Sequence, residues 1–253
     1  MFHFFKKKRA AQPDYGPAPE DFSFLAVDFH SHLIPGVDDG SQEVAHSCNF
    51  IRAFERLGFR KIITTPHIHG DFYRNTAEGL QSGLADVQGE LQKTGCALPV
   101  QVAAEYYLDN YFLDEVLPKG LLPFGDHQVL VEVSMAGWPR NFDQLLFAVQ
   151  AAGYRPVLAH PERYTYVEDV AFFRELKARG VELQMNLLAP TGYYGAPVRR
   201  LAEALLQAGL YDYAASDLHH ERHLANLEGM LRHQKPLMAR LAAYGFKNQQ
   251  LLA

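Results

Sequence analysis

The sequence predicts an α/β fold in which parallel strands close into a regular or distorted barrel within one domain. From residue 24 onward, short apolar runs rich in β-branched residues alternate with amphipathic segments. In a compact domain this alternation gives right-handed crossovers between parallel strands. Seven such strands would leave long exposed edges in one open sheet, so closure into a barrel is favoured.

The expected strands, in chain order, are residues 25–29, 61–65, 100–104, 129–133, 156–159, 181–186 and 211–215. The expected helices are residues 43–57, 75–94, 141–152, 167–179 and 197–208. A glycine follows each helix, where a helix commonly ends in a left-handed residue: Gly58, Gly95, Gly153, Gly180 and Gly209. The last segment, 218–245, is expected to be helical with an interruption at Pro236.

The N-terminal region differs in composition from the rest of the chain. Residues 10–22 are rich in proline and glycine, which is typical of an extended linker. We expect a flexible tail over 1–22 and a single domain over 23–253. Residues 6–9 are all basic and follow three phenylalanines, a pattern compatible with weak contact to an anionic membrane surface. A solvated tail is the simpler interpretation.

Composition and charge exclude several classes of protein. Hydrophobic residues make up 48% of the chain, so disorder throughout is excluded. The formal net charge of -5 argues against a general nucleic-acid partner. Cys48 and Cys96 form no disulfide framework and no CxxC pair, which favours a reducing compartment. With no secretory signal and no long apolar segment, the expected location is the cytoplasm.

Side chains that commonly ligate metals stand at the carboxyl ends of the expected strands, and in a barrel these ends open on one face. His30 and His32 are two residues apart, so both imidazoles point to the same side of a strand and can reach one ion. Asp217 and His219 repeat this spacing. A single pair of this kind is weak support, but two pairs with further ligands at other strand ends indicate a metal site.

Nine side chains form the candidate ligand set: His30, His32, Asp39, His67, Glu105, Glu132, His160, Asp217 and His219. They could instead satisfy one another by hydrogen bonds alone, but crowded carboxylates and imidazoles usually surround a cation. Imidazole and carboxylate without thiolate suit Mn, Fe or Zn. With a bridging carboxylate such as Glu105, the set would serve two or three ions.

Five motifs carry a resemblance to a known family: DFHSHLIPGVDDG at 28–40, TPH at 65–67, AHPERY at 159–164, QMN at 184–186 and SDLH at 216–219. Together they resemble the polymerase and histidinol phosphatase (PHP) superfamily. The most similar branch is that of the bacterial manganese-dependent protein tyrosine phosphatases of capsule and exopolysaccharide operons. The resemblance implies a single-domain, distorted (β/α)7 TIM-like barrel with a trinuclear manganese (Mn²⁺) site.

The resemblance also assigns roles to residues. It implies three ion sites, with the ligands His30, His32, Glu105 and Asp217 at the first, Glu105, Glu132 and His160 at the second, and Asp39, His67 and His219 at the third. Two catalytic arginines are implied: Arg163, in the motif after His160, and Arg222, in the loop after His219. The implied substrate is the phosphotyrosine tail of a bacterial tyrosine kinase that regulates polysaccharide export.

The predicted activity is metal-dependent phosphomonoester hydrolysis, with Arg163 neutralising phosphoryl oxygens. A phenolic leaving group has a pKa of about 10 and needs less help from a general acid than an alkyl alcohol does. A cysteine-based tyrosine phosphatase needs an arginine six residues after its thiolate. Phe54 and Val102 stand at those positions, so that mechanism is excluded.

Three alternatives remain open at this stage. A histidinol-phosphate phosphatase or another small-molecule phosphatase would share all the metal ligands, and a metal-dependent nuclease would share most of them. A non-enzymatic metal-binding regulator is the third. Aromatic residues expected near the site favour a phenol as substrate, although about half of them are expected to be ordinary packing residues: Phe72, Tyr73, Tyr106, Tyr107, Trp138, Tyr164, Tyr193 and Tyr194.

Overall fold

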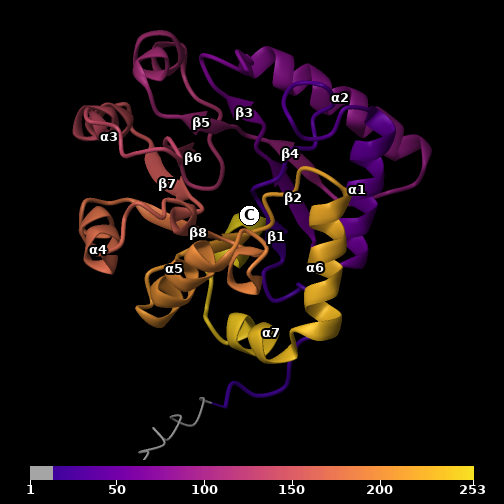
Figure 1. Ribbon diagram of the computed structural model, residues 1–253. Helices are drawn as coiled ribbons and strands as arrows, with labels where there is room; N and C mark the ends of the chain where they lie inside the picture. The colour runs from indigo at the N-terminus through magenta and orange to yellow at the C-terminus, as the bar shows by residue number, and fades with distance from the viewer. Residues whose placement is uncertain (1–13) are drawn as a thin grey trace, which may run out of the picture.

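Parallel strands lie at the centre of the molecule and helices surround them, as the computed structural model shows for residues 14–253 (Figure 1). The basic cluster at residues 6–9, for which we considered membrane contact, lies outside the described residues. The first sheet contains β1 (Val27–Asp28), β2 (Lys61–Thr64) and β4 (Val100–Val102). The second contains, in spatial order, β3 (His67–Ile68), β5 (Glu105–Tyr107), β6 (Gln128–Glu132), β7 (Arg155–Ala159), β8 (Glu182–Asn186) and β9 (Tyr213–Ala215).

The strands follow one another around a ring. Every paired strand of the two sheets is parallel to its neighbour. An isolated parallel bridge joins Ser31, after β1, to Leu218, after β9. Around it the His32 amide donates to the Leu218 carbonyl at 2.9 Å, and the Asp217 amide donates to the His30 carbonyl at 2.7 Å. These bonds bring the first and last strands together, as a barrel requires, and the predicted single-domain α/β class is confirmed.

Two of the seven predicted strands are each interrupted and resume as a second short strand. Pro66 separates β2 from β3, because proline has no amide hydrogen to donate to a neighbouring strand. Its carbonyl still accepts a hydrogen bond from the Glu105 amide at 3.0 Å, just where β5 begins after β4. Each interruption shifts the chain from one sheet to the other, which the continuous apolar runs did not indicate.

The five predicted helices are present: α1 (Val44–Arg56), α2 (Ala77–Lys93), α3 (Phe142–Ala151), α4 (Val170–Ala178) and α5 (Ala196–Gln207). All five glycines expected to end them have positive φ angles. The last segment, expected to be helical with an interruption at Pro236, forms two helices, α6 (Glu221–His233) and α7 (Lys235–Ala242), with the break at Gln234. Pro236 lies in the first turn of α7, where a missing amide hydrogen costs nothing, so it begins a helix and does not interrupt one.

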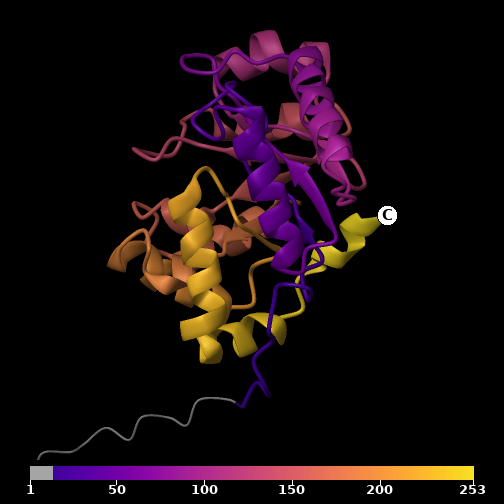
Figure 2. The same ribbon diagram turned by 90° about the vertical axis from the view of Figure 1, so that its right-hand side faces the viewer.

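Short helical turns complete the fold and were not predicted, because segments this short show no periodicity. They are Phe112–Val116, Leu117–Lys119, Pro161–Arg163, Ala189–Thr191 and Lys247–Leu252. Turned by 90°, the molecule shows α1 and α6 running along the same side (Figure 2). No helix within residues 14–253 combines the length and hydropathy needed to cross a bilayer.

Alternate strand residues belong to different parts of the core, as the two-residue period of a strand requires. In β7, Leu158 belongs to the large cluster that includes the helix side chains, whereas Val157 and Ala159 belong to a separate cluster of mainly strand residues. Leu251, from the C-terminal turn, joins this second cluster. Lys61, at the start of β2, donates to the Leu251 carbonyl at 2.7 Å. The C-terminal turn therefore packs against the amino ends of the strands, and the carboxyl ends are left for the site.

Candidate metal centre

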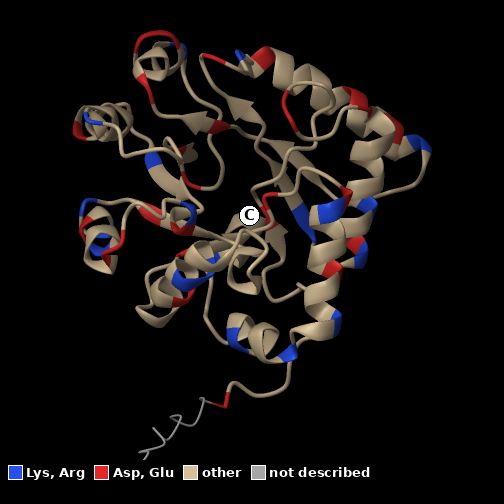
Figure 3. Ribbon diagram, viewed as in Figure 1, with Lys and Arg blue, Asp and Glu red and all other residues tan. Residues whose placement is uncertain are grey.

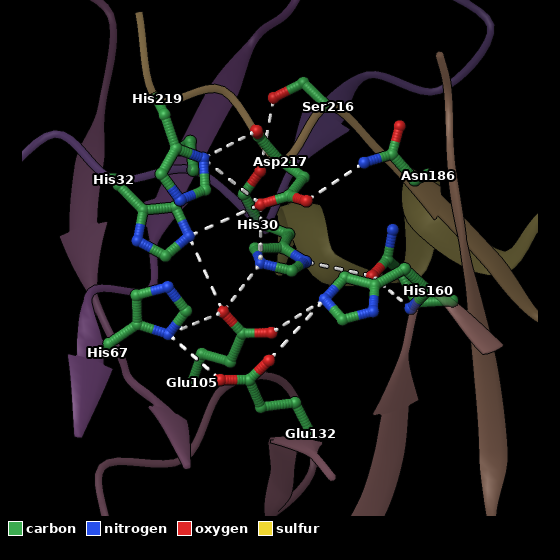
Figure 4. A network of polar contacts seen from close by, with 12 residues as sticks. His30, His32, His67, Glu105, Glu132, His160, Asn186, Ser216, Asp217 and His219 are labelled. Atoms are coloured by element: carbon green, nitrogen blue, oxygen red, sulfur yellow. Dashed lines mark hydrogen bonds and ion pairs between the residues drawn. The ribbon is translucent and has the colours of Figure 1, made fainter. Parts of the chain in front are cut away.

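The structure brings all nine candidate ligands together, and Figure 4 labels each of them except Asp39. Most of them lie at or just beyond the carboxyl ends of strands. Strand register is responsible for part of this arrangement: His67 pairs with Glu105, and Tyr107 pairs with Glu132, in parallel neighbours. Residues at matching heights in adjacent parallel strands lie close together. Side chains up to about 190 residues apart in sequence therefore meet at one point.

Glu105 lies at the centre of the cluster and is fully buried. Its Oε2 atom lies 3.1 Å from His30 Nε2, 3.6 Å from His32 Nε2 and 3.2 Å from His67 Nδ1. Its other oxygen, Oε1, lies 3.2 Å from His160 Nε2. The carboxylate thus contacts imidazoles on two sides, as a bridging ligand would.

The remaining contacts divide the cluster into groups that resemble the three ligand sets implied by the sequence. Asp217 Oδ1 lies 3.2 Å from His30 Nε2 and 3.5 Å from His32 Nε2. Asp39 Oδ1 lies 3.6 Å from His67 Nε2 and 3.5 Å from His219 Nε2.

The Glu132 side chain lies between two of these groups. Its oxygens are 3.2 Å from His67 Nδ1 and 3.9 Å from His160 Nε2. His67 therefore contacts both the second and the third set: its Nδ1 faces Glu105 and Glu132, and its Nε2 faces Asp39.

Two further polar side chains, Asp38 and Gln184, hold the ligands in place. Asp38 Oδ2 lies 2.7 Å from His32 Nδ1 and also accepts the His67 amide hydrogen at 3.1 Å. Gln184 Oε1 lies 2.9 Å from His30 Nδ1. These contacts fix the rings so that Nε2 of each histidine points into the cluster, an arrangement common around metal-ligating histidines. In the sequence, Asp38 and Gln184 stand out only as parts of the motifs at 28–40 and 184–186, with no role of their own.

The loop that carries Asp38 and Asp39 folds tightly over the end of the first strand segment. Gly40 makes this possible, because a Cβ atom at this position would lie 2.3 Å from His32 Cβ and 2.4 Å from the His32 carbonyl oxygen. The Gly40 amide also donates to Asp38 Oδ1 at 2.9 Å. Only glycine allows this close approach, which presents the two aspartates in different directions.

Two candidate ligands adopt left-handed backbone conformations that L-residues rarely use. His160 has φ 34° and Asp217 has φ 51°. The Asp217 amide donates to the His30 carbonyl at 2.7 Å, and Asn186 Nδ2 donates to Asp217 Oδ2 at 3.0 Å. Such conformations cost about 1–3 kcal/mol and persist where surrounding contacts enforce them, frequently at functional sites.

Opposite charges shift the pKa values within the cluster. Burial alone lowers the pKa of His30, but Glu105 and Asp217 outweigh burial and raise this pKa to about 9. Burial alone raises the pKa of Glu105, yet His30 and His67 hold it well below its usual range. Glu105 thus favours its ionised form next to positive charge, which a bound cation would supply in place of imidazole protons.

The donor set fits bound metal ions. Five imidazoles and four carboxylates converge, and no thiolate lies among them. Nε2 of His32 and Oε1 of Glu105 are buried and form no hydrogen bond, despite neighbouring polar atoms at 3.2–3.6 Å. Buried polar atoms without partners are costly in a folded protein, so their convergence is expected where a ligand satisfies them. The arrangement is that of a potential metal-binding cluster with imidazole and carboxylate donors.

A cavity of about 410 Å³ opens above the cluster. Its floor includes Asp39, His67, Glu132, Asp217 and His219.

The two arginines singled out from the sequence differ in their relation to this cavity. Arg163 lines it, with its guanidinium 3.4 Å from Asp217 Oδ2 and 5.0 Å from the centre of the Tyr194 ring. Arg222 is exposed in the first turn of α6, with its guanidinium 5.9 Å from the centre of the Tyr193 ring, and it does not line the cavity.

The aromatic residues expected near the site fall into two groups. Phe72, Tyr73, Tyr107 and Tyr194 line the cavity. Tyr106 and Tyr164 are buried in the core, whereas Trp138 and Tyr193 are partly buried against it.

Five lining residues were not singled out from the sequence: His69, Val133, Met135, His220 and His223. His69, Val133 and Met135 closely follow strand ends, a position that could have identified them, whereas His220 and His223 stand where α6 begins.

Known proteins are similar to this chain in sequence. Tyrosine-protein phosphatase YwqE of Bacillus subtilis (strain 168) is 30% identical over 195 residues, which cover 76% of this chain and 77% of YwqE. Putative tyrosine-protein phosphatase CapC of Staphylococcus aureus is 25% identical, with 76% of each chain covered.

Solved structures are also similar. A structure from work on YwqE of Bacillus subtilis and CpsB of Streptococcus pneumoniae, described as metal-dependent tyrosine phosphatases, superposes with a TM-score of 0.75 at 26% identity and covers 89% of this chain and 94% of the other. An amidohydrolase from Mycoplasma synoviae, at 11% identity and a TM-score of 0.56, covers 91% of this chain and 88% of its own and shares the fold. Residues 26–230 match the family described as "Capsular polysaccharide synthesis, CpsB/CapC", and the chain belongs to that family.

Proposed function

We propose that this protein is a metal-dependent protein tyrosine phosphatase that hydrolyses phosphotyrosine on a bacterial tyrosine kinase regulating capsular or exopolysaccharide synthesis. The observation that carries the proposal is the cluster of nine imidazoles and carboxylates at the floor of an aromatic-lined cavity, with Arg163 beside it. Membership of the CpsB/CapC family and similarity to proteins named tyrosine-protein phosphatases support it.

The proposed ligands for two or three Mn²⁺ ions are the nine clustered side chains, with Fe or Zn as alternatives. His30, His32, Glu105 and Asp217 would hold one ion, Glu105, Glu132 and His160 a second, and Asp39, His67 and His219 a third. When bound, such ions supply Lewis acidity and a nucleophilic water at neutral pH.

The protein's own groups bind and orient the substrate. Arg163 donates to phosphoryl oxygens in a planar fork, because its guanidinium carries several N–H groups and stays charged. Contact with Asp217 and the Tyr194 ring holds this guanidinium at the edge of the cavity. Tyr73 and Tyr107 present ring surfaces against which a flat phenol can pack. Arg222 could act as a second substrate-binding arginine only if the bound substrate reached the first turn of α6.

The lining of the cavity favours a phenol over histidinol phosphate. Histidinol phosphate carries an ammonium group, so a site that selects it should place acidic groups beyond the metal ligands. Among the described residues that line the cavity, the acidic ones are Asp39, Glu132 and Asp217, and all three are proposed ligands. Glu162, two residues after His160, is fully buried and accepts hydrogen bonds from the Asn186 amide and the Tyr211 hydroxyl, so it presents no further acid to the cavity.

A nuclease activity is not favoured by the charge distribution. Within the described residues, Figure 3 shows Lys and Arg interspersed with Asp and Glu along the outer helices. Nucleic-acid backbones bind to continuous basic tracks. The proposed partner is instead the phosphotyrosine tail of the kinase, in the cytoplasm, and no nucleic acid.

The test compares substrates and metals on the same purified protein. A phosphotyrosyl peptide should be hydrolysed with higher kcat/KM than histidinol phosphate or a phosphoseryl peptide. Chelation should abolish turnover, and Mn²⁺ should restore it better than Mg²⁺, since the donor set is rich in imidazole. Faster turnover of histidinol phosphate would transfer the protein to the small-molecule phosphatases, and tight metal binding without turnover of p-nitrophenyl phosphate would make it a regulator.

A further inference from the structure

Exposed apolar side chains are concentrated at the mouth of the cavity. Five large apolar side chains are exposed among the described residues: Tyr15, Phe72, Met135, Phe147 and Tyr166. Three of these stand on loops that follow the carboxyl ends of strands, Phe72 after β3, Met135 after β6 and Tyr166 after β7. Phe72 and Met135 line the cavity itself. Exposed apolar groups gathered beside a functional cavity commonly mark a binding surface.

We propose that Phe72, Met135 and Tyr166 form an apolar rim that binds the residues flanking phosphotyrosine and selects substrates with apolar side chains beside it. This inference rests on the proposed function and adds the sequence preference of the substrate. Phe72 and Met135 line the cavity, so any polypeptide whose phosphotyrosine reaches the metal ligands must lay its neighbouring residues across the mouth.

Phe72 is presented by a tight, well-bonded turn. His69 and Tyr73 pair through two backbone hydrogen bonds of 2.9 Å each, and Phe72 lies between them with 74% of its surface exposed. The Tyr73 ring stacks on His67 with centroids 5.6 Å apart, which ties the turn to the metal centre. His69 contacts both the Phe72 ring, at 4.9 Å between centroids, and the Tyr107 ring, at 3.9 Å. A side chain held in this way binds without first having to be ordered.

The other two rim residues are joined across their loops. The Tyr166 hydroxyl donates to the Ser134 carbonyl at 2.8 Å, next to Met135. Met135 is 40% exposed and Tyr166 is 36% exposed. Methionine adapts to partners of different shape, and tyrosine offers a ring with little conformational entropy to lose. The rim therefore suits apolar side chains of varied form.

The cavity size agrees with this occupant. A volume of about 410 Å³ lies within the range of roughly 300–1,000 Å³ that is usual for sites binding drug-sized molecules. It offers more room than a phosphate group needs, with the apolar residues at the outer part. Continuity with the metal centre favours a substrate peptide over a second copy of the chain or a lipid surface.

The experiment uses two phosphotyrosyl peptides that differ only at the residues on either side of phosphotyrosine, Leu in one and Ser in the other. The wild-type holoenzyme should prefer the Leu peptide in kcat/KM by roughly three- to tenfold, the gain expected from partial burial of apolar side chains. Phe72→Ser should bring this ratio toward one, mainly through a higher KM for the Leu peptide. Met135→Ser should do the same to a smaller extent.

Phe147→Ser is the matched control, because Phe147 is 71% exposed on α3 and does not line the cavity. This variant should keep the wild-type ratio. Equal wild-type turnover of the two peptides would overturn the rim while leaving the phosphatase proposal intact. Turnover of histidinol phosphate but of neither peptide would overturn both.

Sedimentation of the same variants tests whether a second copy of the chain binds to the rim instead of a substrate peptide. If wild-type protein is a dimer and Phe72→Ser makes it monomeric, the rim is a subunit interface and the proposal fails. An unchanged sedimentation coefficient together with a lost peptide preference supports substrate binding. If Phe72→Ser lost p-nitrophenyl phosphate turnover to the same extent as turnover of the Leu peptide, the turn would support the metal centre. That result would also contradict the proposed role of the rim in peptide binding.

Discussion

Replacement of Arg163 by Ala should remove most turnover and leave the metal content unchanged. The guanidinium lies at the edge of the cavity, 3.4 Å from Asp217 Oδ2. It can donate hydrogen bonds to phosphoryl oxygens but has no lone pair with which to ligate a cation. Asp217 keeps its contacts with His30 and Asn186 in the variant, so the cluster should persist.

The expected magnitude follows from the bonds lost. A charge-assisted hydrogen bond contributes about 1.5–3 kcal/mol, and the fork geometry of Arg163 allows two of them to one phosphoryl group. Because the side chain is 30% exposed, solvent screening reduces the sum to about 3–4 kcal/mol, or roughly 10²- to 10³-fold in kcat. Arg163→Lys keeps the charge but loses the fork, and it should retain an intermediate rate.

The assay measures kcat and KM for p-nitrophenyl phosphate and a phosphotyrosyl peptide, with the metal content from elemental analysis. Arg155→Ala is the matched control, because Arg155 stands at the opposite end of β7 and pairs with Asp126 and Glu182 on the surface. It should be fully active. A kcat/KM for Arg163→Ala within twofold of wild type would refute the substrate role, and loss of metal together with activity would show a structural one.

Three further predictions concern two residues of the metal centre, Glu105 and Asp38, and the buried carboxylate Asp212. Glu105→Ala should lose two ions per chain by elemental analysis, since its two oxygens face different imidazoles; an unchanged stoichiometry would remove it from the ligands. Asp38→Asn should weaken metal binding about 10- to 100-fold in a competition titration, because Asp38 orients His32; unchanged affinity would contradict this. Burial raises the pKa of Asp212, but hydrogen bonds from Lys177 and Lys247 outweigh burial and lower the pKa below 3.8. Its contribution to stability is therefore full above about pH 4 and is lost as the pH falls through the folded pKa. Asp212→Asn should lower the free energy of unfolding at pH 7 by about 1–3 kcal/mol, with a smaller difference from wild type at pH 3, measured in urea; a difference that grows at pH 3 would contradict the assignment.

The sequence by itself determined the order of the elements and the side of the fold on which the chemistry lies. The hydrophobic pattern alternates between a two-residue period in strands and a helical period in helices. This pattern depends only on neighbours along the chain, so helices α1 to α5 could be predicted. Glycines such as Gly153 and Gly180 ended helices because they adopt a left-handed conformation at little cost. The nine candidate ligands could be identified because strand ends are local features, and parallel pairing necessarily brings them to one face.

Tertiary structure alone decided how neighbouring residues divide their roles. Asp38 and Asp39 are adjacent and chemically alike, yet one is bound to His32 and the other is 56% exposed toward His67 and His219. Gly40 approaches His32 closely in the same loop, and no spacing rule predicts such a contact.

The same holds for the aromatic residues and for Arg222. Tyr106 and Tyr107 are consecutive in β5, and the strand turns the first into the core and the second into the cavity. The direction of α6 places Arg222 over Tyr193 and outside the cavity lining. Contacts of this kind depend on how distant segments pack, because sequence spacing fixes the direction of a side chain only relative to its own element.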